Sequence, residues 1–114
     1  MYNVPGYLAA PLAIPDPLNA AGGKAITTAV TFTAPTTAAN ARFVEVDCET
    51  NDCHVTCGAN AAGMTTATTL IGRKVRADSY RIFALPTSPV IGDRPVISVI
   101  AATGTTNVNV FWLP

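Results

Sequence analysis

The sequence has few charged residues: they make up 12% of its 114 residues, whereas roughly 25% is usual in soluble domains. Its 7 basic and 7 acidic residues cancel, so the formal net charge is zero. Proteins that bind nucleic acids usually carry a basic patch and a clear excess of positive charge, which this composition lacks. We therefore expect no nucleic acid among the partners of this protein.

Long apolar runs are also missing. Proline recurs at Pro5, Pro11, Pro15 and Pro17 among the apolar N-terminal residues, and no basic segment precedes them, so a signal peptide is not expected. No stretch approaches the roughly 18 consecutive apolar residues of a membrane-spanning helix. The sequence therefore predicts no membrane partner, and a protein that is kept in the cytoplasm or released from it by lysis.

Familiar catalytic motifs are absent: there is no P-loop, no dinucleotide-binding glycine motif and no G-x-S-x-G nucleophile elbow. Acidic residues that could act as general acids or bases do gather at Glu45, Asp47, Glu49 and Asp52. Their spacing along a strand and a turn is more typical of a solvated face. We expect no enzymatic activity and no cofactor.

The three cysteines and the single histidine lie close together, at Cys48, Cys53, His54 and Cys57. These are the donor types of a Cys₃His zinc site, but the C-x₄-C-x₃-C spacing lacks the usual C-x₂-C pair. Adjacent residues of a strand point to opposite faces, so Cys53 and His54 cannot bind one metal ion or form a catalytic pair. We therefore expect no metal site.

Two interpretations of the cysteines remain open. The same alternation places Cys48, Cys53 and Cys57 on the core side with His54 outside, where the cysteines can serve as small buried apolar residues, and this interpretation is favoured. Alternatively, Cys48 and Cys53 face each other across a turn at 49–52 and form a disulfide. Directly opposite strand positions lie slightly too far apart for a relaxed bridge, which counts against the second interpretation.

Threonine is abundant where charge is scarce, and the apolar fraction is 49%. Threonine is β-branched and fits a half-exposed strand, and its hydroxyl costs less to desolvate than the charge of lysine or glutamate. A surface of this kind loses little when a neighbouring protein covers it, which favours a role in an assembly. The clustered threonines are Thr27, Thr28, Thr31, Thr33, Thr36, Thr37, Thr65, Thr66, Thr68, Thr69, Thr105 and Thr106.

From residue 24 onward, apolar and polar residues alternate with a period of two, which is typical of strands. The turn at 49–52 is expected to join two strands into a hairpin, and Thr103–Gly104 to join the last two strands into a pair. No window has the pattern of an amphipathic helix. This predicts an all-β protein, a small antiparallel β-sandwich or jelly roll with an extended N-terminal arm. The expected strands span 26–33, 42–48, 53–57, 76–85, 96–101 and 106–112.

The expected arm comprises residues 1–23, and the β-sandwich domain comprises residues 24–114. The arm contains four prolines and a single charge, Asp16, so neither a helix nor a central strand is expected there. It either folds back over its own domain and covers a sheet edge, or docks on a neighbouring subunit, which is the favoured alternative. Its candidate interface residues are Tyr2, Val4, Tyr7, Leu8, Leu12, Ile14 and Leu18.

Two further features concern packing. Trp112 lies in phase with Val108 and Val110, which predicts a core position; the alternative is an interface anchor, a role in which tryptophan is enriched. Basic residues recur within 73–81 and are typical of a solvated strand edge, where they discourage pairing with other strands. We therefore keep Trp112 as a candidate interface residue and expect the basic stretch to lie at a sheet edge.

Five short segments follow one another from Ala41 onward in a recognisable order. They are Arg42–Val46, Cys53–Asn60, Met64–Thr69, Tyr80–Pro86 and Gly104–Val110. This order resembles small virion structural proteins of tailed bacteriophages, of the head decoration or cement type. The proline-rich arm and the extra cysteines depart from that pattern, which leaves the station on a particle open.

The resemblance implies a non-enzymatic protein located in the virion, assembled in the host cytoplasm, whose partners are the major capsid protein or other virion proteins. We expect it to stabilise the capsid lattice through subunit contacts and its arm, as a homo-oligomer for which a trimer is favoured. The alternative is a head–tail connector or a fibre-associated module that binds carbohydrate or another receptor. Such a module needs exposed aromatic and acidic groups at one site, for which only Tyr80, Trp112 and the acids near the 49–52 turn qualify.

Overall fold

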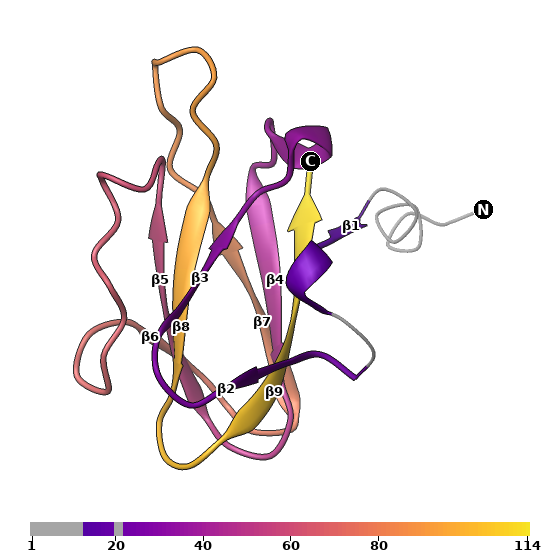
Figure 1. Ribbon diagram of the computed structural model, residues 1–114, viewed down its shortest axis with the longest axis vertical. Coiled ribbons are helices and arrows are strands. Elements are labelled where there is room, and N and C mark those ends of the chain that lie inside the picture. Colours follow the sequence, from indigo (N-terminus) through magenta and orange to yellow (C-terminus); the bar gives the residue numbers. More distant parts are fainter. Residues whose placement is uncertain (1–12, 20–21) are drawn as a thin grey trace.

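The structure of the protein is a computed structural model that describes residues 13–19 and 22–114. Two antiparallel sheets pack face to face, with two short 3₁₀ turns, η1 (Pro17–Asn19) and η2 (Thr36–Ala38) (Figure 1). The prediction of an all-β sandwich is therefore confirmed. Sheet A contains β1 (Ile14–Pro15), β2 (Lys24–Ile26), β9 (Thr106–Leu113), β4 (Phe43–Cys48) and β7 (Ser79–Ala84). Sheet B contains β3 (Val30–Thr33), β8 (Val96–Ala101), β5 (Cys53–Gly58) and β6 (Arg73–Val75).

The strand order is that of a jelly roll. In sheet A, β9 lies between β4 and the short strands β1 and β2, and β7 follows β4; in sheet B the order is β3-β8-β5-β6. The chain changes sheet after β2, β3, β4, β6, β7 and β8, which is the connectivity of a double-sheet jelly roll. In this part of the chain, no helix is long and apolar enough to cross a membrane.

The expected pairing of consecutive strands is wrong. β4 and β5 were expected to form a hairpin around the 49–52 turn, but β4 pairs with β7 and β9, and β5 pairs with β6 and β8. The last two strands, β8 and β9, also lie in different sheets. The alternation of apolar and polar residues determines which side chains face the core. It is the same whether two consecutive strands pair as a hairpin or lie in different sheets, so it cannot predict the pairing.

The single strand expected over 26–33 is also wrong, because the chain changes sheet within it. Ile26 ends β2 in sheet A and Phe32 lies on β3 in sheet B, and both side chains are fully buried. The bend between them is exposed, and the Thr27 hydroxyl forms a 2.7 Å hydrogen bond with the hydroxyl of Thr105. The sequence also missed β6, whose three residues pair with the start of β5.

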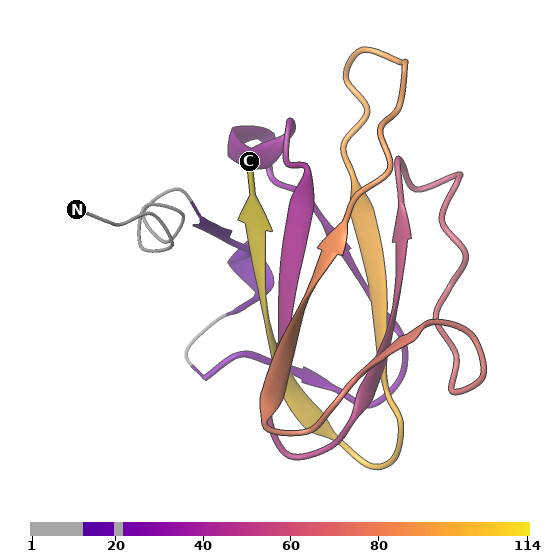
Figure 2. The same ribbon diagram turned by 180° about the vertical axis from the view of Figure 1, so that it is seen from behind.

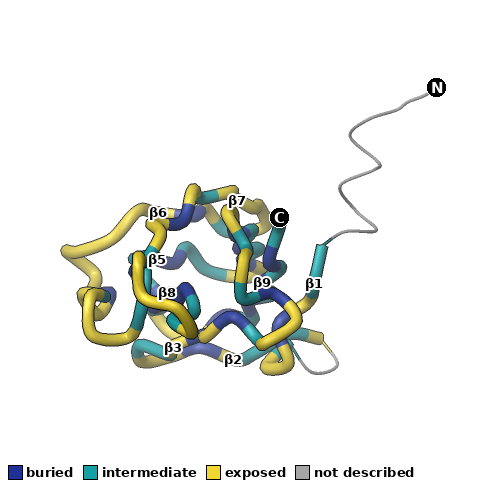
Figure 3. Tube along the Cα trace, turned by 90° about the horizontal axis from the view of Figure 1, so that it is seen from above, coloured by how far each residue is buried: buried dark blue, intermediate teal, exposed yellow. Residues whose placement is uncertain are grey.

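Most of the core is supplied by the inward-facing residues of the long strands, and Figure 3 shows these buried positions between the two sheets. Two buried hydroxyls serve loops that lie outside the strands. Ser98 accepts a hydrogen bond from the backbone N–H of Ala67, at 3.0 Å. Thr106 accepts bonds from the backbone N–H groups of Thr50 and Asn51. Burial of these polar groups is therefore offset by hydrogen bonds.

Residues 13–19 are fixed on β9 of the same chain. β1 pairs with Phe111 and Trp112. The buried Asp16 carboxylate accepts a 2.9 Å hydrogen bond from the Trp112 Nε1–H. The Asn19 side chain bonds both the N–H and the C=O of Val110, at 2.8 and 2.7 Å. This part of the expected arm therefore folds back and covers a sheet edge, which is the alternative that the sequence did not favour.

These contacts attach residues 13–19 of the expected arm to the sandwich, and the burial of Trp112 confirms its predicted core position over the alternative of an interface anchor. Trp112 is fully buried, so it is a core residue and not an exposed anchor. Ile14 packs against the core, and Leu18 remains 40% exposed. The other candidate interface residues of the arm, Tyr2, Val4, Tyr7, Leu8 and Leu12, lie outside the described residues.

We predict that Asp16→Ala destabilises the fold by about 1–3 kcal/mol, because it leaves the buried Trp112 N–H without an acceptor. The substitution also removes the 2.9 Å hydrogen bond from the Leu18 N–H to the Asp16 carboxylate. Urea unfolding followed by the fluorescence of the single tryptophan measures the change. The matched control is Glu49→Ala, at an exposed acidic residue, which should leave the midpoint unchanged. Equal midpoints for both variants would contradict the role given to Asp16.

Candidate functional site

The outer face of sheet A carries a mixed apolar and acidic surface. Because Val44 and Val46 of β4 face the core, the intervening Glu45 and Asp47 face outward. Their cross-strand neighbours, which share this face, form two rows. The rows are Tyr80–Asp47–Asn109 and Ile82–Glu45–Phe111, taken from β7, β4 and β9 in turn. We call these six residues the outer face.

Asp47 is the most perturbed acid of this face. Its partial burial, together with a hydrogen bond to Glu45 and the charge of that carboxylate, raises the pKa of Asp47 from 3.8 to about 7. Its Oδ1 atom is buried and has no hydrogen-bond partner in the structure. The surface around these acids is apolar, with Tyr80 62% and Ile82 49% exposed. This face therefore displays acidic, aromatic and aliphatic side chains side by side on the surface of a sheet, a composition that suits contact with another molecule.

A groove of about 680 Å³ lies at the open side of the sandwich, between β7 and the strands β5 and β6. Arg73, Arg81 and Phe83 are among its lining residues, and the Arg81 guanidinium lies 5.4 Å from the centre of the Phe83 ring. Arg81 also donates a 3.0 Å hydrogen bond to the carbonyl of Lys74. Cys57 lines the groove as a free thiol, and burial raises its pKa to about 11. The thiol is therefore protonated at neutral pH, which slows its reactions as a nucleophile without abolishing them.

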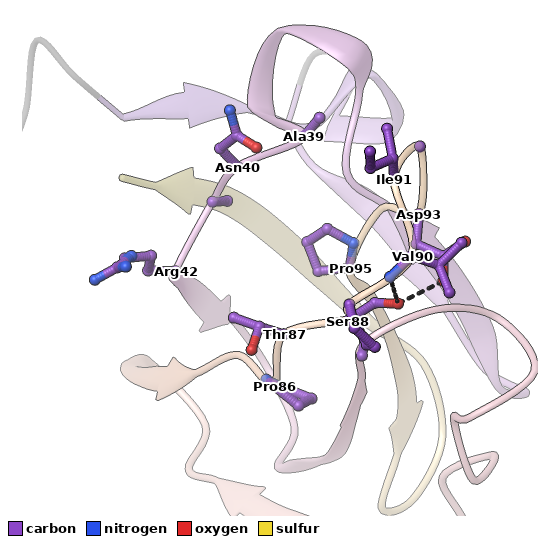
Figure 4. Close-up of a pocket in the computed structure, with 14 residues that line it drawn as sticks. Ala39, Asn40, Arg42, Pro86, Thr87, Ser88, Val90, Ile91, Asp93 and Pro95 are labelled. Carbon is purple, nitrogen blue, oxygen red and sulfur yellow. Dashed lines mark hydrogen bonds between the residues drawn. The ribbon is translucent and has the colours of Figure 1, made fainter.

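A second pocket, of about 470 Å³, lies among the loops at the end of the sandwich (Figure 4). The Asp93 carboxylate organises it by accepting hydrogen bonds from Ser88, at 2.7 Å, and Asn60, at 2.8 Å. These bonds hold the pKa of Asp93 below its usual value. Val90 and Ile91 are displayed at the exposed tip of the same loop. Asp93 thus acts as a structural acceptor that ties Ser88 to Asn60 beside this pocket.

The structure joins Cys48 and Cys53 by a disulfide. Both residues are buried, and the bond connects β4 of sheet A to β5 of sheet B. The favoured interpretation, three unconnected buried thiols, is therefore wrong for this pair. It assumed that the two cysteines face each other within one sheet, whereas they lie on different sheets with their Cα atoms 6.7 Å apart, within the range that a disulfide spans. Cys57 remains a free, half-buried thiol.

His54 lies on the opposite side of β5 from Cys53, as the alternation predicted. Its neighbours across the sheet are Lys74 and Ile100. Its Nδ1 atom is buried without a hydrogen-bond partner. Within residues 13–19 and 22–114, no three His, Cys, Asp or Glu side chains are grouped so that they could hold a metal ion.

The other two acids near the 49–52 turn, Glu49 and Asp52, do not lie on the outer face. Glu49 is exposed beyond the end of β4, and Asp52 lies next to β6, with its carboxylate 3.6 Å from the Lys74 ammonium. A hydrogen bond from the Ala77 N–H and the nearby positive charges lower the pKa of Asp52. The sequence therefore singled out Glu45, Asp47 and Tyr80 correctly as surface groups. It missed Ile82 and Phe111, because nothing in the sequence places β4 between β7 and β9.

No protein-family model, no curated protein and no solved structure matches this chain. The jelly-roll architecture does not decide the function either, because it occurs in capsid proteins, in lectins and in other domains with unrelated roles. What the protein does must therefore follow from the surfaces of this chain and from the chemistry of the side chains that they display.

We predict that stability decreases as the pH rises from about 4 to about 7, because the folded state holds the Asp47 proton more tightly than the unfolded state. Asp47→Asn should remove this loss, because the amide carries no charge at any of these pH values. We expect it to raise the free energy of unfolding at pH 8 by only about 1 kcal/mol, because solvent screens the charge of a half-buried carboxylate. Thermal unfolding at pH 4 to 8 measures the effect. The control Glu49→Gln should keep the slope of the parent, and a parental slope in Asp47→Asn would refute the assignment.

We predict that reduction of the Cys48–Cys53 disulfide lowers the free energy of unfolding by about 2 kcal/mol, the value expected for a short closed loop. Guanidinium unfolding with and without dithiothreitol measures the loss, and the double variant Cys48→Ala, Cys53→Ala should show no response to the reductant. Cys57→Ser is the matched control and should respond as the parent does. A parent insensitive to verified reduction would contradict a stabilising role for the bond.

Proposed function

We propose that this chain is a non-enzymatic structural protein of a virion, with a cement or decoration role on the capsid. Its partners are the major capsid protein or other virion proteins, and it acts as a homo-oligomer. The observation that carries this proposal is the contrast between residues 13–19, which are bonded to β9, and the twelve residues before them, which are uncharged and include five large apolar side chains. Residues 13–19 fix one end of this apolar sequence on the domain, and its composition suits binding to a neighbouring subunit.

The composition of the surface supports the same role. The four residues of β3 show how threonine takes the place of charge, because Thr31 and Thr33 are exposed while Phe32 is fully buried. An exposed threonine loses less hydration free energy than a lysine or glutamate when another protein covers it. A lattice that buries the same surface in many copies gains from this small cost at every contact.

The disulfide is compatible with a virion location. Disulfides are rare in the reducing cytosol and persist on virion surfaces, among other oxidising environments. A particle assembled in the host cytoplasm and released by lysis would meet oxidising conditions after release. Oxidation of Cys48 and Cys53 would then form the bond that connects sheets A and B. The bond would stabilise the fold outside the cell, where chaperones cannot refold the protein.

The surroundings of four candidate reactive residues support a non-enzymatic role. The Cys57 thiol is protonated at neutral pH, and the Asp93 carboxylate is occupied by hydrogen bonds from Ser88 and Asn60. Glu45 and Asp47 lie on a sheet face and not in a cleft. A general base needs access to a bound substrate proton, and a flat face does not position one.

A fibre-associated module that binds carbohydrate is the second candidate function, and one observation favours it. Tyr80, Asp47 and Asn109 lie in one row of the outer face, so an aromatic ring, a carboxylate and an amide are adjacent. Sugars present hydroxyl donors and apolar faces that match such groups. Trp112, which the sequence also offered for this role, is buried and unavailable. A glycan array with the parent and Tyr80→Ala separates the two functions, since only a sugar-binding protein gives hits that the substitution abolishes.

The attachment role is tested by deleting residues 1–12, which leaves Asp16 and Asn19 in place. We predict that the truncated chain unfolds at the parental temperature but binds purified particles at least about tenfold more weakly, because several large apolar side chains are lost from the contact. Mass spectrometry first identifies particles that contain this protein. Co-sedimentation of each variant with these particles then measures the binding. The matched control replaces residues 1–12 by a glycine–serine segment of the same length.

Two results would contradict the proposal. Absence of the protein from purified particles would exclude a virion role, and undiminished binding of both the truncated and the glycine–serine chains would exclude attachment through residues 1–12. Deletion of residues 1–20 is unsuitable as a test, since it removes the Asp16 acceptor of the Trp112 N–H and destabilises the fold itself.

A further inference from the structure

β7 is the longest free edge in the described part of the chain. Sheet A ends on one side at β1 and β2, of two and three residues, and on the other side at β7, of six residues. The edges of sheet B are β3, of four residues, and β6, of three. Figure 2 shows β7 (orange) at the front of the molecule, beside β4, and Figure 3 shows its trace mostly exposed. A long exposed edge is a template for pairing with another strand.

The backbone groups at this edge can be identified from the ends of the ladders. The Leu85 N–H bonds the carbonyl of Arg42, and the Glu49 N–H bonds the carbonyl of Asn107. Even-numbered residues of β4 therefore bond β7, and odd-numbered residues of β7 bond β4, because successive residues of a strand bond to opposite sides. The N–H and C=O groups of Tyr80, Ile82 and Ala84 consequently point away from sheet A.

We propose that β7 pairs with β7 of a second copy of this chain in antiparallel orientation, with Ile82 opposite Ile82 on a two-fold axis. Sheet A then continues through both copies, and the contact is isologous. Tyr80, Ile82 and Ala84 of each strand exchange backbone hydrogen bonds with Ala84, Ile82 and Tyr80 of the other. The proposal goes beyond the virion role, because it holds whether or not the chain binds a particle.

Charge selects this register over its nearest competitor. The bonding pattern requires even-numbered residues of one strand to face even-numbered residues of the other, which leaves two registers with similar overlap. In one, Arg81 lies opposite Arg81 of the second copy, and like charges directly opposite destabilise a strand pair. In the other, which we propose, Arg81 lies opposite Phe83. Each copy already holds its own Arg81 guanidinium 5.4 Å from a Phe83 ring, so the pairing repeats a contact that the chain makes by itself.

The remaining neighbours in this register are compatible. On the outer face, Ile82 meets Ile82, and Tyr80 meets Ala84, so the exposed apolar side chains of β7 cover one another. Glu45 of one copy lies three strand spacings from Glu45 of the other, or about 14 Å, beyond the Debye length of about 8 Å at physiological salt. The acidic pairs therefore do not oppose the contact.

The groove provides space on the inner side of the added strand. It borders β7 and is lined on its far wall by Val55, Thr56 and Cys57. Its volume of about 680 Å³ accommodates the side chains that an added strand directs inward, which in this register are those of Arg81 and Phe83. Pairing would therefore fill the open side of the sandwich and shield the Cys57 thiol.

Hydrogen exchange on the parent chain tests the pairing without any substitution. We expect the amide hydrogens of Ile82 and Ala84 to exchange at least about tenfold more slowly at high than at low protein concentration, because only the paired state protects them. Alkylation of Cys57 should slow over the same concentration range. The internal control is Asn51, away from β7, whose amide exchange should not depend on concentration.

Sedimentation tests the partner. Ile82→Lys places like charges opposite each other and should weaken dimerisation by about tenfold or more. The matched control, Ile91→Lys, makes the same change at the exposed loop tip and should dimerise as the parent does. Both positions are exposed, so parental unfolding temperatures are expected and will confirm folding.

Other outcomes overturn the proposal. A parent that sediments as a monomer at about 1 mM excludes a dimer of useful affinity. Protection of Ile82 and Ala84 that is independent of concentration, and is lost when residues 1–12 are deleted, would identify that segment as the occupant of the edge instead. If the Ile82→Lys variant forms an oligomer, including a trimer, as readily as the parent, the subunit contact lies elsewhere. This result would overturn the pairing of β7 but would not contradict the virion role.

Discussion

Each sheet of this protein has one face that consists almost entirely of apolar side chains, and these two faces leave water only by packing against each other. Fully buried residues of both sheets, among them Val46 and Val110 of sheet A and Val55 and Val99 of sheet B, form one core between them. Since side chains alternate along a strand, burying one set forces the other set outward. The outer face of sheet A, with its acids and its exposed apolar groups, is a direct consequence of this packing.

The same core determines where the N-terminal segment is fixed. Trp112 fills the interior, and its indole N–H, once buried, needs an acceptor. The Asp16 carboxylate provides one, and Asn19 bonds both backbone groups of Val110 on the same strand. Residues 16–19 are thereby fixed on β9, and the proposed attachment through residues 1–12 starts from this fixed point.

The jelly roll also concentrates the free backbone groups at one edge. A two-sheet sandwich has four edges, and here three of them are formed by strands of two to four residues, whereas β7 has six. Arg81 lies in the middle of this edge, where a charge ordinarily discourages pairing. Because its guanidinium contacts the Phe83 ring within the chain, the same charge favours the proposed register, in which Arg81 lies opposite Phe83 of the second copy. The acids one strand further in, Glu45 and Asp47, are too distant to interfere.

Much of this protein follows from the sequence alone, because alternation and turn residues are local. They determine the all-β class, the limits of strands such as Val96–Ala101, the outward position of Glu45 and Asp47, and the separation of Cys53 from His54. The partner of each strand is not local. Only the tertiary structure decided that β4 lies between β7 and β9, that Cys48 meets Cys53 across two sheets, and that Asp16 meets Trp112. These contacts join distant segments, and the alternating pattern is equally satisfied by a hairpin or by a crossing.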